Sequence, residues 1–317
     1  MLKYLIIPLA KDAVSFCHYE RSAISGDLIS LDILKKAIFW SMKENLTVQF
    51  LYPDYEIPTE HKEIIETIDH VKIAGSRCKD CDVKSKADIV AFDGWDSLRE
   101  FHFETDKSYV VRTNKEELFG CSELLKGLLP KINRLVVVIT DVETFEDGDF
   151  DRYKAFLDSL IPAVKSEYEA GHNVQLNLLT DRLFLDGMNN CNAGSEAITL
   201  APDGKFYICP AFYLDGAYNV GDLDTGLNIR NHLLYKMDFA PICRNCDAWQ
   251  CRRCIWLNRK ITLEVNTPSR EQCVMAHIER NASKKLLDSI RTLGEFLPGK
   301  IIDEINYLDP FEIIDRK

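Results

Sequence analysis

The chain has 317 residues and a formal net charge of -11, and it is 46% hydrophobic and 28% charged. This composition is typical of a soluble globular protein and excludes a disordered or collagen-like chain. The acidic balance disfavours broad binding to nucleic acid, which needs a basic surface. The longest apolar runs, at residues 4–10 and 135–140, are too short to cross a membrane. The first residues lack the features of a signal peptide, so we expect a cytoplasmic protein.

Residues 1–185 alternate between strand-like and helix-like segments. Short apolar runs predict strands that are covered on both faces, at residues 3–7, 47–51, 88–92, 108–112, 134–140 and 173–178. Apolar residues at helical spacing predict helices between them, at residues 31–44, 58–67, 95–101, 115–128 and 149–169. The clearest helix begins after Ser30, a capping residue. Residues 70–75 form a further apolar run that fits neither series neatly.

Strict alternation of strand and helix predicts right-handed βαβ units and a parallel sheet. We therefore predict an α/β fold in which residues 1–185 form a (β/α)6 partial barrel. A doubly wound flat sheet fits the same order of elements nearly as well. In both architectures, ligands bind beyond the carboxyl ends of the strands.

The segments after the first two strands carry candidate side chains. Cys17 and His18 follow the first strand and are either a reactive thiolate pair or buried structural residues. Asp54 and Glu56 follow the second strand and either face a ligand or are solvated loop residues. Neither segment has the glycines with which a phosphate-binding loop approaches its ligand. The sequence therefore gives no support for nucleotide binding of that kind.

Eleven cysteines in a cytoplasmic chain indicate metal ligands or redox thiols rather than structural disulfides. Four of them are scattered over the first 190 residues: Cys17, Cys78, Cys81 and Cys121. Cys78 and Cys81 form a lone Cys-x2-Cys pair, which is a surface loop, an adventitious metal clip or a redox motif. The other seven fall in the next 83 residues: Cys191, Cys209, Cys243, Cys246, Cys251, Cys254 and Cys273. We therefore expect a separate cysteine-rich domain over residues 186–275.

The spacing of these seven cysteines indicates an inorganic cofactor. Four of them form a Cys-x2-Cys-x4-Cys-x2-Cys block at residues 243–254, and Cys273 follows after eighteen further residues. Thiolate-rich sites select zinc or iron–sulfur clusters, because both favour soft sulfur donors. Four-coordinate zinc would leave three of the seven thiols unused.

The elements of the last third are predicted from shorter signals. Residues around Cys209 are typical of a β-hairpin with its turn at residues 202–204, and residues 218–226 indicate a second turn. Residues 276–296 indicate a helix, and the remainder of the tail, to residue 317, is expected to form a strand or short helix that packs back on the barrel.

The cysteine pattern resembles that of the SPASM and twitch auxiliary-cluster domains of radical SAM peptide-modifying enzymes. Their pattern is a cysteine, a Gly-x4-Cys, a gap, a Cys-x2-Cys-x5-Cys-x3-Cys block and a final cysteine. The match covers about residues 188–275, and all seven cysteines have counterparts, although two spacings in the block are one residue short. The resemblance implies one [4Fe–4S] cluster on Cys243, Cys246, Cys251 and Cys273, and a second on Cys191, Cys209 and Cys254. The second cluster would lack a nearby fourth cysteine.

By the same resemblance, the N-terminal part corresponds to the radical SAM partial barrel. Its Cys-x3-Cys-x2-Cys motif, which holds the S-adenosylmethionine-cleaving cluster, is absent: with Cys17 as the third cysteine, the other two positions hold Ala10 and Val14. The segment YPDYEIP stands where a glycine-rich GGEP-like segment is expected. Within the wider group, SFCHYE, KENLTVQFLYPDYEIP and the cysteine layout most resemble the Cys-Xaa-Xaa-Xaa repeat peptide maturases, which are linked with small cysteine-rich repeat peptides.

The resemblance implies an iron–sulfur protein of a ribosomal peptide maturation system, whose partners are a cysteine-rich precursor peptide and a modification protein. Two alternatives stay open, because the S-adenosylmethionine-cleaving motif is absent. The chain is either a peptide-modifying enzyme, or a non-catalytic relative that binds the peptide or relays electrons for a separate maturase. A third alternative, a zinc-stabilised binding module, is disfavoured by the odd number of ligands. Neither nucleic acid nor a membrane is an expected partner.

Basic and aromatic residues surround the cysteine block. The basic ones are Arg244, Arg252, Arg253, Arg259 and Lys260. They either compensate the negative charge of a thiolate-bound cluster, form a solvated face, or dock an acidic leader peptide. Trp249 and Trp256 are expected in the core of the small domain.

Overall fold

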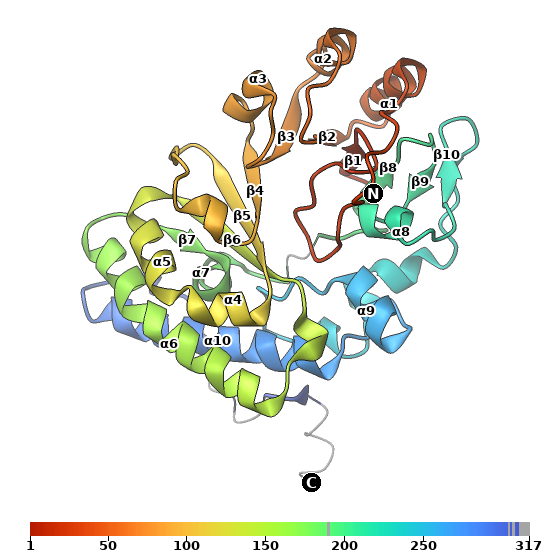
Figure 1. Ribbon diagram of the computed structural model, residues 1–317. Coiled ribbons are helices and arrows are strands. Elements are labelled where there is room, and N and C mark those ends of the chain that lie inside the picture. The colour runs from red at the N-terminus through yellow and green to blue at the C-terminus, as the bar shows by residue number, and fades with distance from the viewer. Residues whose placement is uncertain (189–190, 304, 306–307, 311–317) are drawn as a thin grey trace. The chain divides into compact units, whose positions relative to one another are not determined.

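The structure is a computed structural model that describes residues 1–188, 191–303, 305 and 308–310. It contains two compact units, and each is built from two separate stretches of the chain. Unit 1 consists of Met1–Phe92 and Cys191–Ala240, and unit 2 consists of Asp93–Asn190 and Pro241–Lys317. Figure 1 labels the elements of both units. Among the described residues, no helix is both long enough and apolar enough to span a bilayer.

Unit 1 is built on a sheet whose strands lie in the order β4, β3, β2, β1, β8, β9. The strands are β1 (Tyr4–Pro8), β2 (Thr47–Leu51), β3 (His70–Gly75), β4 (Ile89–Asp93), β8 (Ala197–Leu200) and β9 (Phe206–Tyr207). Helices connect the first four of them: α1 (Leu31–Lys43), α2 (Thr59–Ile65) and α3 (Cys81–Ser85). Neighbouring strands are parallel except β9, which is antiparallel to β8. The predicted α/β class is therefore confirmed.

The C-terminal stretch of unit 1 contains both predicted turns. Strands β8 and β9 form the expected hairpin, with Leu200 opposite Phe206, and the turn needs Gly204 because its φ is +78°. Helix α8 (Pro210–Leu214) follows directly. Strands β10 (Gly221–Asp222) and β11 (Gly226–Leu227) form an antiparallel pair at the second predicted turn. Two 3-10 turns complete the stretch: η4 (His232–Tyr235) and η5 (Met237–Phe239).

Unit 2 contains three parallel strands in the order β5, β6, β7: β5 (Ser108–Thr113), β6 (Arg134–Ile139) and β7 (Gln175–Leu176). Its α-helices are α4 (Lys115–Gly120), α5 (Ser122–Leu128), α6 (Asp147–Glu169), α7 (Asn177–Phe184), α9 (Ile255–Thr262) and α10 (Arg270–Arg291). Its 3-10 turns are η1 (Asp96–Leu98), η2 (Leu129–Lys131), η3 (Val142–Thr144) and η6 (Cys243–Asn245). The two long helices α6 and α10 lie side by side (Figure 1), joined by a hydrogen bond of 2.6 Å from Tyr153 to Glu279.

Several predicted elements differ from the observed ones. Residues 70–75, which fitted neither series, form strand β3. The helix predicted at 95–101 is wrong, because only the 3-10 turn η1 forms there; the chain instead packs Phe101 and Phe103 edge-on against Tyr109. The helix predicted at 115–128 is two helices that meet at Cys121, whose thiol donates to the Leu118 carbonyl at 3.1 Å.

The predicted strand at 173–178 is cut short by a side chain. Asn177 accepts a hydrogen bond from the Val137 amide at 2.8 Å and donates one to the Val137 carbonyl at 3.0 Å. The side chain therefore pairs with β6 while the backbone turns into α7. The C-terminal helix begins at Arg270, earlier than predicted, and ends at Arg291. Beyond it, the described residues contain no strand, and the rest of the predicted tail element lies outside the described residues.

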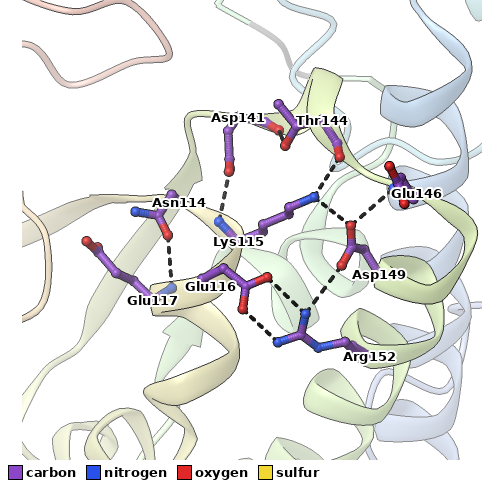
Figure 2. A network of polar contacts seen from close by, with 9 residues as sticks. All are labelled: Asn114, Lys115, Glu116, Glu117, Asp141, Thr144, Glu146, Asp149 and Arg152. Carbon is purple, nitrogen blue, oxygen red and sulfur yellow. Dashed lines mark hydrogen bonds and ion pairs between the residues drawn. The ribbon is translucent and has the colours of Figure 1, made fainter.

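A polar network joins the loop after β5 to helix α6 (Figure 2). The Lys115 amide donates to Asp141, which follows β6, and the Lys115 ammonium pairs with Asp149 at 2.6 Å. Beside this pair, Arg152 binds Glu116 at 2.9 Å. The hydrogen bond from Lys115 holds the pKa of Asp149 below its usual range. Because these charges are paired with one another, we interpret the network as a structural joint at the carboxyl ends of β5 and β6.

Candidate metal centre

A cavity of about 510 Å³ lies within unit 2, and four cysteines line it: Cys243, Cys246, Cys251 and Cys273. These four are the set that the family resemblance implied as the ligands of one cluster. The volume is in the range of cavities that hold a bound cofactor. The lining also includes His277 and Arg280, which the sequence analysis did not single out.

Two short turns and one helix position the four thiols. Cys243 begins the 3-10 turn η6, and the amide of Cys246 donates to the Cys243 carbonyl at 3.0 Å. The Cys251 amide donates to the Ala248 carbonyl at 3.0 Å, which forms the next turn. Cys273 lies in the first turn of α10, so a residue distant in sequence completes the set. Tight turns bring the sulfur atoms of a Cys-x2-Cys pair to one side of the backbone, as metal binding requires.

The sulfur of Cys246 has two polar neighbours. The Ala248 amide donates to it at 3.4 Å, and Nε2 of His277 lies 3.6 Å away. The other ring nitrogen, Nδ1, is bonded to the Leu308 carbonyl, which can only accept. Nδ1 therefore carries a hydrogen, and the orientation of the imidazole is fixed by the chain beyond α10.

Burial makes all four groups weak acids as free thiols. It raises the pKa of Cys243 to about 11 and that of Cys251 to about 12, and it also raises the pKa of Cys246 and Cys273. Free thiols with such pKa values are protonated near neutral pH. A metal binds thiolates, so loading of this site must displace protons.

The four thiols surround a cavity. Among the described residues, no group of three or more His, Cys, Asp and Glu side chains is close enough to hold a metal ion. In a [4Fe–4S] cluster each thiolate binds a different iron, so its ligands stand around a volume rather than at a point. The residues present therefore fit the group that the resemblance implies.

The other three clustered cysteines are divided between the two units. Cys191 is exposed and Cys209 half-buried in unit 1, where Cys209 immediately precedes α8. Cys254 belongs to unit 2, where it precedes α9 and does not line the cavity. Their assignment to a second cluster stays a prediction.

The loop after β1 of unit 1 contains buried side chains at the two positions that the resemblance assigns to cysteines. Ala10 and Val14, at these positions, are 0% and 3% exposed. A cavity lined by Ala10, Ala13 and Tyr19 measures about 10 Å³, which is the space of about one water molecule. Cys17 and His18 are half-buried in the same loop.

The two candidate carboxylates after β2 differ in environment. Asp54 pairs with Arg21 at 2.7 Å, and its Oδ1 is buried with no hydrogen-bond partner. Gly75 permits this position, because a Cβ there would lie 2.7 Å from Asp54 Oδ1. Glu56 is exposed and pairs with Lys62.

The remaining cysteines have separate surroundings. Cys78 is buried and its thiol lies 3.7 Å from the Pro53 carbonyl, whereas Cys81 is exposed at the start of α3. Cys121 is buried, and burial raises its pKa to about 12. Its thiol is therefore protonated and inert near neutral pH.

The basic residues around the cysteine block differ in exposure. Arg244, Arg259 and Lys260 are exposed, whereas Arg253 is buried. Lys260 pairs with Glu143 at 2.7 Å. Of the two tryptophans, Trp249 is stacked against Arg182, with 3.9 Å between the guanidinium and the ring centre.

No family model matches the chain, and no curated protein matches it. Solved structures match the chain in fold. Native anSMEcpe with bound AdoMet and the Cp18Cys peptide has a TM-score of 0.61 and 14% identity, over 92% of this chain and 100% of that one. Histidine-tagged anSMEcpe with bound AdoMet has a TM-score of 0.61 and 16% identity over the same shares. Streptococcus suis SuiB bound to the precursor peptide SuiA has a TM-score of 0.47 and 12% identity, over 84% of this chain and 74% of that one.

Proposed function

We propose that this chain is an iron–sulfur protein of a peptide maturation system, which binds a cysteine-rich precursor peptide and does not itself cleave S-adenosylmethionine. The observation that carries the proposal is the cavity of unit 2 with its four cysteines. Cys243, Cys246, Cys251 and Cys273 would hold one [4Fe–4S] cluster, which supplies one-electron transfer when bound. A peptide is the proposed partner because anSMEcpe, which has the same fold, was solved with one.

The proposal that the chain does not cleave S-adenosylmethionine rests on unit 1. That reaction requires three cysteines around a cluster with one open iron, and this chain has Ala10 and Val14 at two of the positions. Both side chains are buried, and neither carries an atom that binds a metal. We therefore favour a helper that presents the peptide or relays electrons to a separate maturase. Cys191, Cys209 and Cys254 are candidate ligands of a second cluster.

Anaerobic reconstitution tests the proposal directly. We expect about four irons and four labile sulfides per chain with one cluster, or about eight of each with two. Cys251→Ser and Cys273→Ser should each lose the visible absorption and the iron of the first cluster. Cys81→Ser, an exposed thiol of unit 1, is the matched control and should retain both.

Two outcomes would contradict the proposal. Zinc without labile sulfide would instead support a zinc-stabilised binding module. Release of methionine and 5'-deoxyadenosine by the reduced, loaded chain would show that it cleaves S-adenosylmethionine. Peptide binding is measured separately, by the change in fluorescence anisotropy of a labelled peptide with a cysteine at every fourth position.

A further inference from the structure

Two buried arginines share one carboxylate beside the cysteine cavity. Arg280 donates from Nε and Nη2 to the two oxygens of Asp247, each at 2.7 Å. Arg182 donates from Nη2 to Asp247 at 3.3 Å. The side chains of Arg182 and Arg280 are 2% and 1% exposed. Two buried positive charges thus face one negative charge, on an Asp247 side chain that is 39% exposed.

The excess charge is not balanced by other side chains at this place. Among the described residues, the only ion pair of Arg182 is with Asp247, and its Nε and Nη1 are buried without a hydrogen-bond partner. Lys300 lies 4.9 Å from the centre of the Trp249 ring on which Arg182 stacks, but its charge is paired with Asp186 at 3.2 Å. A buried unpaired charge costs several kcal/mol, so this position calls for an anion.

The other acids near the cavity do not supply that anion. Asp303 lines the cavity but is exposed, so water screens its charge. Asp309 is buried and pairs with Arg270 at 3.1 Å. Burial raises the pKa of Glu279 to about 7, so this group carries only part of a charge near neutral pH.

The charged group borders the cysteine cavity. Asp247 follows Cys246 in the chain, and both Asp247 and Arg280 line the cavity. The buried charge of Arg280 therefore lies at the wall of the cavity that Cys246 shares.

We infer that Arg182, Asp247 and Arg280 form a charge-compensating group that retains a thiolate-bound cluster in this cavity and raises its reduction potential. The inference rests on the proposed function. A cluster with four thiolate ligands is negatively charged and becomes more so when it gains an electron. A buried cation close to it stabilises the reduced state more than the oxidised state.

A series of variants that changes the charge in both directions tests the inference. Arg182→Gln lowers the net charge of Arg182, Asp247 and Arg280 by one, and Asp247→Asn raises it by one. The double variant restores the original net charge. The ratio of reduced to oxidised cluster is measured by EPR-monitored titration at the midpoint potential of the unaltered protein. We expect the ratio to fall at least roughly threefold in Arg182→Gln, to rise in Asp247→Asn and to return in the double variant; a tenfold change equals about 59 mV for one electron.

Two further variants keep the test decisive. Lys285→Gln removes an exposed charge from the same helix as Arg280, where Lys285 pairs with Asp158, and should leave the ratio unchanged. Asp303→Asn removes a solvent-screened charge from the cavity wall and should raise the ratio by less than Asp247→Asn. The Asp247 side chain is itself 39% exposed, so Asp247→Asn stays informative if Arg182→Gln does not fold. No rise in Asp247→Asn, or a larger rise in Asp303→Asn than in Asp247→Asn, would overturn the inference alone. A chain that binds no iron and sulfide would overturn the proposed function as well.

Discussion

Glu279 lies in the middle of α10 and faces both α6 and the cysteine block. Its carboxylate accepts hydrogen bonds from Tyr153 at 2.6 Å and from Gln250 at 3.4 Å. Burial raises its pKa to about 7, and these two hydrogen bonds and Arg252 only partly oppose the rise, while Asp181 adds to it. A single carboxyl group thus retains its proton to a higher pH than usual inside unit 2.

This raised pKa predicts a loss of stability as the pH rises. The folded chain holds the Glu279 proton more tightly than the unfolded chain, so the fold is not penalised below pH 4.5, and the destabilisation grows from pH 4.5 to pH 7. We expect the free energy of unfolding of the Glu279→Gln variant to be higher than that of the unaltered protein. The difference should be at most about 3 kcal/mol at pH 8 and much less at pH 5. Urea unfolding at the two pH values measures the difference, and a difference that does not change with pH would contradict the assignment.

The residues of the cavity show what the sequence could predict about the site. The four cysteines are recognisable because metal-ligand thiols keep short, regular spacings along the chain. His277, Arg182 and Arg280 carry no such signal. They reach Cys246 and Asp247 only because α7 and α10 fold against the block, and arginines on a predicted helix are ordinarily solvated. The sequence analysis considered charge compensation, but assigned it to the arginines next to the cysteines, of which Arg244 and Arg259 are exposed.

Among the elements, helix α10 connects stability to the site. Its N-cap is Ser269, which is 4% exposed. The Ser269 hydroxyl accepts a hydrogen bond from the Gln272 amide at 3.3 Å, and the Ser269 carbonyl accepts one from the Cys273 amide. The same residue therefore begins the helix and fixes the backbone of a cavity cysteine.

We expect Ser269→Ala to lower the free energy of unfolding by about 1 kcal/mol, because one amide of the first turn loses its partner. We also expect faster loss of iron to a chelator, because Cys273 lies in that turn. Ser30→Ala is the matched control: Ser30 caps α1 of unit 1 with a similar bond of 3.3 Å to the Ile33 amide. It should cost similar stability without changing the rate of iron loss, and equal rates in the two variants would show that the cap does not act on the site.

Strands with a clear local sequence pattern could be predicted. Strands whose bounds depend on tertiary contacts could not be predicted. Strand β2 was predicted at its observed residues because Val48 and Phe50 alternate with polar residues and a Pro-Asp turn signal follows at residues 53–54. Strand β3 could not be assigned, since its histidine and lysine break the apolar pattern; Lys72 is nevertheless 7% exposed and pairs with Glu66. Strand β7 ends early because Asn177 takes the place of backbone pairing, which no periodicity reveals.

At the scale of the whole molecule, both units depend on both halves of the chain. Strand β1 pairs with β8 from the C-terminal stretch of unit 1, with Tyr4 opposite Ala197. Helix α6 of unit 2 packs on α10, which begins about a hundred residues later. A break near residue 185 therefore divides both units.

We expect a fragment of residues 1–185 to show no cooperative thermal transition, because β1 loses a neighbour and α6 loses the helix that covers it. The fragment of residues 186–317 should behave in the same way, since it has little core of its own without metal. Circular dichroism during heating measures both. Coexpression of the two fragments should restore a single folded species, whereas a cooperative transition in residues 1–185 alone would contradict this view of the units.

The division of each unit between distant stretches also sets an order on biosynthesis. The cysteine cavity cannot close until α10 and residues 303–310 have been translated, since Cys273, Asp303 and the Leu308 carbonyl all belong to its surroundings. Translation proceeds at about 5–20 residues per second. Several seconds therefore pass between the synthesis of the first three cysteines of the cavity and the synthesis of the last residues that surround it. On the proposed function, iron and sulfide would therefore be delivered after residue 310 has been translated, and a carrier that supplies them would recognise the folded unit rather than a nascent segment.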